Sequence, residues 1–229
     1  MAEHVRWGIL GTAMIARKNW ASIKNAPNAT LVAVASRSEE RAAQYIDECQ
    51  SQVPHETKPR AIGSYEEMIA ADDIDAIYVP LPTGTRAEWC IKAANAGKHV
   101  LGEKPCGVDV AELESILHAC KANNVQYMDG VMFMHSARLP KMRETLDDKE
   151  SVGDLRRIQS GFSFMAPADF IENNIRINSD LEPMGCLGDL GWYNIRISLF
   201  AMNYEMPSTV SGRLLTDMKR DDSPNHVPL

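Results

Sequence analysis

Short apolar runs alternate with longer amphipathic stretches over the first 130 residues of this 229-residue chain. The apolar runs have the length of strands and lie at residues 5–10, 31–35, 74–79, 99–101 and 125–128. Stretches with the spacing of helices lie between them, at residues 38–49, 64–70, 86–96 and 111–122. Strands that alternate with helices predict parallel strands joined by right-handed crossovers.

The pattern changes after Gly130, where we place a domain boundary. It predicts two further helices, at residues 137–146 and near 189–203, and strands at residues 155–165 and near 209–215. Residues 219–223 are typical of a hairpin turn, and residues 226–229 of the start of a returning strand. This is an α+β layout, and because the returning strand is barely begun, we expect the second domain to be incomplete at its C-terminus.

Composition narrows the class of protein. The net charge of −7 argues against a surface for nucleic acid or anionic membranes, which select clustered Lys and Arg. No apolar run has the length of a membrane span, and the N-terminus shows no signal peptide. The five cysteines are scattered and form no C-x-x-C pair, so we expect no disulfide framework and no metal site. A cytoplasmic protein is the resulting expectation.

A glycine-containing turn follows the first strand. Gly11 suits a tight turn, a small residue beyond it lets the backbone approach a pyrophosphate, and Ala16 lets the next helix pack on the strand. The motif is imperfect because Ala13 stands where a glycine is usual. The alternative is a purely structural turn. The predicted cofactor-binding residues here are Gly8, Gly11, Thr12, Ala13, Met14 and Ile15.

The end of the second strand indicates which dinucleotide binds. Ser36, Arg37 and Arg41 offer a hydroxyl and two guanidinium groups, and no carboxylate stands where an NAD-specific site would hold the ribose. We therefore predict NADP, with NAD as the alternative. Ser38 is the predicted N-cap of the next helix. The alternative role for Arg37 is only to cover the face of the adenine ring, without binding a phosphate.

Two more strand ends carry candidate cofactor-binding residues. Leu81, Pro82 and Thr83 follow the strand at 74–79, and Thr83 offers a hydroxyl near the expected nicotinamide. A rigid connector without a ligand is equally compatible with this segment. Glu103 and Lys104 follow the strand at 99–101, at the sheet edge where ligands bind. The proline after Lys104 disfavours a helical conformation at Lys104, although a surface lysine remains the plain alternative.

The second domain carries a carboxylate and a phenol four residues apart, Asp189 and Tyr193. On a helix they share one face. Spacing alone favours an N-cap and a packing residue over an acid/base pair. His135 and Arg176 are weaker candidates for substrate contacts. His135 could line a substrate cleft, although a half-buried histidine with satisfied hydrogen bonds is favoured, and Arg176 could reach a substrate hydroxyl, although a solvated loop charge is the default.

In their order and spacing, these segments closely resemble the Gfo/Idh/MocA oxidoreductases. The resemblance implies an N-terminal Rossmann domain with a doubly wound parallel sheet, residues 1–130. It also implies a substrate and dimerisation domain with an open, mainly antiparallel sheet, residues 131–229. Members of this family are longer than this chain and use the remaining part of the sheet to dimerise, so the resemblance implies a homo-oligomer if the second sheet is complete. Thr83 and Arg86 depart from the family, which often carries Asn and His at or near these positions.

The resemblance implies an NAD(P)-dependent oxidoreductase that transfers a hydride between the nicotinamide and a sugar, polyol or related carbonyl compound. Tyr193 would be the proton-transfer group. Its reference pKa of about 10 makes it a poor base, and a neighbouring ammonium from Lys104 would favour the phenolate. Asp189 would bind a sugar hydroxyl or orient Lys104. The alternative is a non-catalytic, dinucleotide-sensing regulatory protein on the same fold.

Overall fold

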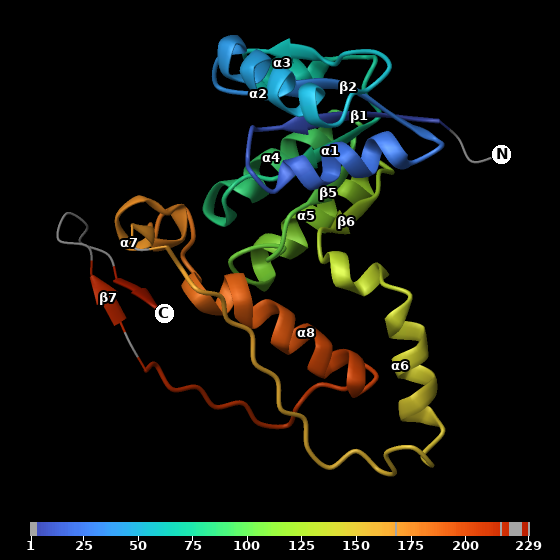
Figure 1. The fold of residues 1–229 in the computed structure, drawn as a ribbon, viewed down its shortest axis with the longest axis vertical. Coiled ribbons are helices and arrows are strands. Elements are labelled where there is room, and N and C mark those ends of the chain that lie inside the picture. The colour runs from blue at the N-terminus through green and yellow to red at the C-terminus, as the bar shows by residue number, and fades with distance from the viewer. Residues whose placement is uncertain (1–3, 168, 216, 220–225, 229) are drawn as a thin grey trace. The chain divides into compact units, whose positions relative to one another are not determined.

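The structure is a computed structural model and describes residues 4–167, 169–215, 217–219 and 226–228 (Figure 1). Its contacts divide the chain into two compact units, Met1–Gly130 and Val131–Leu229. The division lies at residue 130, where the sequence analysis places a boundary.

A six-stranded sheet, entirely parallel, forms the first unit, with the strand order β3-β2-β1-β4-β5-β6. The strands are β1 (Val5–Leu10), β2 (Ala29–Ala35), β3 (Arg60–Ile62), β4 (Ala76–Val79), β5 (His99–Gly102) and β6 (Tyr127–Asp129). The order reverses between the neighbours β1 and β4, which makes the sheet doubly wound and its carboxyl edge there a ligand-binding position. The predicted Rossmann sheet is confirmed.

Five helices accompany these strands, drawn in blue to green in Figure 1. They are α1 (Ala16–Asn25), α2 (Glu39–Gln52), α3 (Tyr65–Ala70), α4 (Thr83–Asn95) and α5 (Val110–Ala122). Ser38 accepts a hydrogen bond from the backbone of Arg41, which confirms it as the N-cap of α2. Helix α4 begins earlier than the pattern predicts, because Pro82 directly before it already has the backbone φ of a helix start.

The core lies on both faces of the sheet. Ile77 and Tyr78 are neighbours on β4, yet they belong to different apolar clusters, as the alternation of side chains along a strand requires. One cluster contains residues of α1 and α2, and the other contains residues of α3, α4 and α5. Burial on both faces explains why these strands read as continuous apolar runs.

In the described residues of the second unit, short helices are joined by long irregular segments. Its elements are η1 (Met132–His135), α6 (Arg138–Asp147), α7 (Phe170–Asn173), η2 (Ile175–Ile177), the π-helical turn η3 (Leu187–Gly191), α8 (Trp192–Ala201), β7 (Asp217–Lys219) and β8 (His226–Pro228). The helices predicted at 137–146 and near 189–203 are confirmed. Strands β7 and β8 pair antiparallel, so the predicted returning strand is present over residues 226–228.

Two predicted strands are wrong. Residues 155–165 and 209–215 are irregular and exposed along their whole length, and neither segment pairs with another strand in the described part of the chain. The alternation that suggested the first strand is real, but Phe162 and Phe164 stay 47% and 49% exposed. A strand exists only where a neighbour accepts its backbone hydrogen bonds. The turn predicted at 219–223 lies outside the described residues beyond Lys219.

Candidate functional site

The turn after β1 has the backbone that a dinucleotide site needs. Gly11 has a φ of +115°, a conformation that side chains rarely adopt, and its N–H donates to the carbonyl of Ala35 at 2.8 Å. A Cβ added to Gly11 would lie 3.1 Å from a methyl carbon of Leu81. Gly8 is buried inside β1, and a Cβ there would lie 2.9 Å from the sulfur of Met68. The first glycine thus packs against α3, and Gly11 shapes the turn.

Thr12, Ala13, Met14 and Ile15 connect this turn to α1. The carbonyls of Ala13, Met14 and Ile15 accept hydrogen bonds from the first N–H groups of the helix, at 3.0–3.2 Å. Met14 is 77% exposed. These four residues therefore lead directly into the first turn of α1, and the Met14 side chain extends into solvent.

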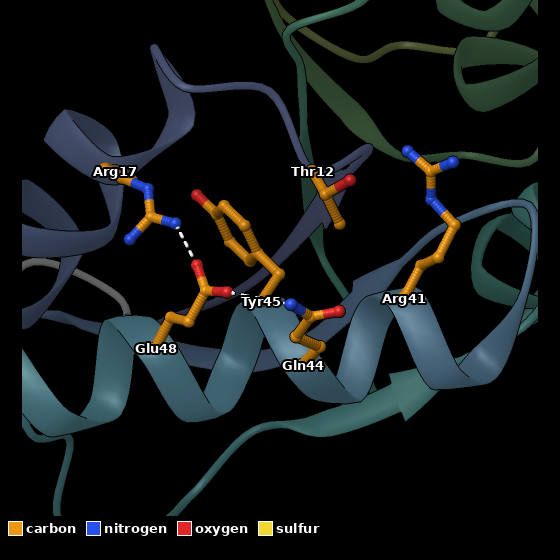
Figure 2. A pocket seen from close by; sticks show the side chains of 6 residues that line it. All are labelled: Thr12, Arg17, Arg41, Gln44, Tyr45 and Glu48. Atoms are coloured by element: carbon orange, nitrogen blue, oxygen red, sulfur yellow. Dashed lines mark hydrogen bonds and ion pairs between the residues drawn. The ribbon is translucent and has the colours of Figure 1, made fainter.

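A cavity of about 350 Å³ adjoins this turn (Figure 2). Its lining residues are Thr12, Arg17, Arg41, Gln44, Tyr45 and Glu48. Arg17 forms an ion pair with Glu48 and lies over the Tyr45 ring, 5.3 Å from its centroid. Figure 2 shows Arg41 and Thr12 at the other end of the cavity, away from this pair. Two of the predicted cofactor residues, Thr12 from the turn after β1 and Arg41 from α2, thus line one cavity.

Arg37 and Arg41 share a neighbour that sequence reasoning missed. Burial raises the pKa of Tyr65, and the nearby charges of Arg37 and Arg41 oppose that rise. The Tyr65 hydroxyl also lies 3.7 Å from where a Cβ on Gly11 would stand. Tyr65 therefore joins the glycine turn to the two arginines. Tyr65 lies just after β3, a strand of three residues that the apolar pattern does not predict. Without that strand, nothing in the sequence pattern placed Tyr65 beside the glycine turn.

The segment after β4 differs from its predicted form. Thr83 was expected to present its hydroxyl beside a nicotinamide, but it is the first residue of α4 and only 1% exposed. Its hydroxyl accepts a long hydrogen bond of 3.5 Å from Arg86. Leu81 faces the glycine turn, and Pro82 precedes the helix. Leu81 is thus the member of this segment that borders the site.

Glu103 points inward from the end of β5. Its side chain accepts a hydrogen bond from the Tyr78 hydroxyl at 2.6 Å and another from the backbone N–H of Lys104 at 3.2 Å. Burial, followed by the nearby Glu103 carboxylate, raises the pKa of Tyr78. Glu103 therefore connects the start of the Lys104 loop to the buried Tyr78 side chain of β4. Lys104 is half-buried, and the peptide bond that joins it to Pro105 is cis.

In the second unit, Asp189 forms an ion pair. The Nε of Arg176 donates to an Asp189 carboxylate oxygen at 2.6 Å, and the Asp189 side chain is only 15% exposed. Arg176 is therefore ion-paired and not only a solvated charge, although its side chain remains 43% exposed. Asp189 lies in the π-helical turn η3, and Tyr193 is the second residue of α8. The two residues therefore do not lie on one regular α-helix, in contrast to what their four-residue spacing predicted. π-Helical turns of this kind are frequent at functional sites.

Tyr193 lines a cavity of about 330 Å³ within the second unit. Phe162 stands edge-on to its ring, with centroids 5.3 Å apart, and the Phe133 ring lies 5.9 Å away. Polar groups share the same lining: Ser136, Arg138 and Asn194. A cavity with aromatic walls and a few polar groups is the usual form of a small-molecule site. His135 is exposed and is not among the residues of this lining.

Among the described residues, no group of three or more His, Cys, Asp or Glu side chains is arranged to hold a metal ion. None of the helices within those residues has the length and apolar character of a membrane span.

Comparison with known proteins connects both units to enzymes. The profile of the oxidoreductase family with an NAD-binding Rossmann fold, GFO_IDH_MocA, matches residues 5–131. The chain is 34% identical over 189 residues to D-xylose 1-dehydrogenase (NADP(+)) 2 of Haloferax volcanii, a match that covers 82% of this chain and 54% of that protein. It is 31% identical over 198 residues to the dTDP-3,4-didehydro-2,6-dideoxy-alpha-D-glucose 3-reductase of Actinomadura kijaniata, covering 85% and 55%.

Solved structures show the same kind of similarity. The fold is similar to that of a 3-ketoreductase from Actinomadura kijaniata in complex with NADP and TDP-benzene, with a TM-score of 0.78 and 28% identity. That match covers 87% of this chain and 58% of the other. The same ketoreductase has been crystallised with a tyrosine replaced by phenylalanine and with a lysine replaced by alanine.

The chain spans little more than half the length of these relatives. The profile nevertheless matches more than half of the chain, and the sheet has the doubly wound strand order with the glycine turn at its switch point. The chain belongs to the Gfo/Idh/MocA family of oxidoreductases.

Proposed function

We propose that the protein is an NADP-dependent oxidoreductase that transfers a hydride between the nicotinamide and a carbon of a sugar or related carbonyl compound. The observation that carries the proposal is the carboxyl edge of the parallel sheet. There the Gly11 turn, the arginines after β2 and Lys104 after β5 stand on the strands around the switch point. The enzymes that this chain resembles are named as NADP-dependent or as sugar reductases.

The residues at this edge fit a dinucleotide. Gly11 has the positive φ of a tight turn between strand and helix, the backbone form at which a pyrophosphate can approach. Arg37, Arg41 and Ser36 would hold a 2′-phosphate, because guanidinium groups form paired hydrogen bonds to phosphate oxygens. When bound, the nicotinamide supplies the position that accepts or donates the hydride.

Tyr193 would move the proton in this reaction. Removing a hydroxyl proton from a carbinol calls for a base, and a tyrosine serves only if its phenolate is favoured. The Lys104 ammonium would favour it by charge. Lys104 belongs to the first unit and Tyr193 to the second, so their meeting at the reacting carbon is itself part of the proposal. Asp189, held by Arg176, would bind a substrate hydroxyl or orient Lys104.

Absorbance of NADPH over time, with a panel of ketosugars, aldoses, inositols and dicarbonyls, tests the proposal in the reducing direction. Substrate-dependent loss of absorbance with NADPH, and a slower loss with NADH, is the expected result. Tight NADPH binding without turnover of any panel member would instead favour a dinucleotide-sensing regulator. The homo-oligomer expected from the resemblance stays a prediction, to be measured by sedimentation.

A further inference from the structure

We infer that Arg86 is a positioning residue that fastens the Lys104 loop to the turn after β4, an inference that rests on the proposed function. Arg86 lies in the first turn of α4 and is 4% exposed. Neither the glycine turn nor the acid/base motif includes it. Its side chain nevertheless touches both segments that border the nicotinamide end of the proposed site.

The guanidinium group makes five hydrogen bonds. Its Nε and one terminal nitrogen both donate to the carbonyl of Leu81, at 2.9 and 2.7 Å. Its other terminal nitrogen donates to the carbonyls of Glu103 and Pro105, at 2.8 and 2.5 Å. The fifth bond goes to the Thr83 hydroxyl at 3.5 Å. A guanidinium group has five N–H donors in a rigid fork, so this geometry uses all of them.

The acceptors of this fork belong to two neighbouring strand ends. Leu81 follows β4, and Glu103 and Pro105 follow β5, which pairs with β4. Lys104 lies between the two carbonyls that Arg86 binds after β5. Its backbone conformation is therefore held on both sides by one side chain that also holds the turn facing Gly11. A buried cation is costly unless its hydrogen bonds are satisfied, so breaking this arrangement carries a penalty.

No other natural side chain reproduces this arrangement. A lysine keeps the charge, but it carries three donors on a single nitrogen and cannot span carbonyls on both sides of the fork. The loop would then move relative to the turn, and the Lys104 ammonium with it. Misplacement of a catalytic group by about 1 Å can cost about 100-fold in rate.

The test uses the full chain with Arg86→Lys and Arg86→Met, and with Arg60→Lys as the matched control. Arg60 also donates from two nitrogens, to Asp73 at 2.6 and 2.7 Å, but its pair is exposed and lies at β3. Amide hydrogen exchange is measured by mass spectrometry over residues 80–83 and 102–107. We expect exchange of both segments to rise in the Arg86 variants and to stay unchanged in Arg60→Lys.

The kinetic arm measures kcat, KM and the pH profile with the best substrate of the panel. For Arg86→Lys we expect kcat to fall about 100-fold, KM to change little, and the pH of half-maximal kcat to move to higher values. The pH shift follows because a displaced ammonium no longer favours the phenolate. A general loss of stability would not move the pH profile of the folded fraction.

Two results would overturn the inference: unchanged local exchange in Arg86→Lys, or a uniform rise over the whole first unit with an unaltered pH profile. If Arg86→Met does not fold, Arg86→Lys decides, since it keeps the charge and the apolar stem. Absence of turnover in the wild-type chain would contradict the proposed function. The exchange measurement would still decide whether Arg86 fastens the two segments.

Discussion

Single residues at the proposed site are held by partners from other segments. Glu103 binds the Tyr78 hydroxyl, and Asp189 binds Arg176 across 13 positions of sequence. Each carboxylate is thereby oriented before any ligand arrives. This preorganisation is what a site for proton and hydride transfer requires, because misaligned groups lose rate steeply.

Replacing the proposed proton-transfer group should stop the reaction without releasing the cofactor. In Tyr193→Phe we expect kcat to fall by about 10²- to 10⁴-fold, the usual contribution of a positioned acid or base. Lys104→Ala should have an effect of the same order, and NADPH binding should stay within a few-fold in Tyr193→Phe. Stopped-flow turnover and NADPH fluorescence titration measure the two quantities. Tyr204→Phe, which changes an exposed tyrosine, is the control.

Near-normal turnover by Tyr193→Phe would remove Tyr193 from this role.

Arg41 should distinguish the two dinucleotides. Arg41→Ala is expected to weaken NADPH binding by about 10- to 100-fold, since a hydrogen bond to a charged group contributes about 1.5–3 kcal/mol. NADH binding should change little, because NADH has no 2′-phosphate. Isothermal titration of both nucleotides, with Arg60→Ala as a control for lost positive charge, measures the effect. An equal loss for NADH and NADPH would place Arg41 elsewhere than at the 2′-phosphate.

Among the elements, helix starts are where local sequence and structure agree best. Ser38, Ser64 and Asp109 each accept a backbone N–H three residues on. The bond of Asp109 is the shortest of the three, at 2.8 Å, and Glu112 in turn accepts the N–H of Val108 at 2.7 Å. These caps are local interactions, so the chain pattern contains them.

Removing the Asp109 cap should therefore destabilise the first unit. We expect Asp109→Ala to lower the free energy of unfolding by about 1 kcal/mol, measured by urea unfolding followed by circular dichroism. Ser38→Ala is the comparison, because the Ser38 bond is longer, at 3.4 Å, and its cost should be smaller. A larger loss for Ser38→Ala would contradict this ranking.

The sequence pattern predicted the strands less accurately than the helices. The apolar runs that became β1, β4 and β5 contribute side chains to the apolar clusters on both faces of the sheet, and they were recognised. β3 was missed because it has three residues and begins with the exposed Arg60. Residues 155–165 alternate as a strand would, yet they remain irregular, because alternation does not supply a partner strand. Strand identity in this chain thus depended on pairing, which is not a local property.

At the scale of the whole first unit, an ion pair connects the two halves of the sheet. Arg6 on β1 binds Asp75, which precedes β4, through its side chain and its backbone N–H. The hydrogen bond from the Arg6 side chain is the largest cause that lowers the pKa of Asp75, to about 2. In the unfolded chain an aspartate has a pKa of about 3.9.

This difference sets the pH dependence of stability. Because the folded pKa is the lower one, the contribution of Asp75 is complete above about pH 4 and is lost as the pH falls towards 2. We expect Asp75→Asn to be less stable than the wild type at pH 6, with the difference narrowing between pH 4 and pH 3. Urea unfolding midpoints across this range measure it, with Glu56→Gln as an exposed control. A difference that is independent of pH would exclude the Asp75 carboxylate as its source.

The sequence by itself determined the β-α alternation, the parallel sheet, the glycine turn and the arginines after the second strand. These features follow from periodicity and from the backbone needs of single residues, which are local. Only the tertiary structure decided that Arg86 binds two loops, that Arg176 pairs with Asp189, and that Thr83 is buried. Hydrogen bonds of buried charges join segments distant in sequence, and their partners are selected by packing rather than by spacing.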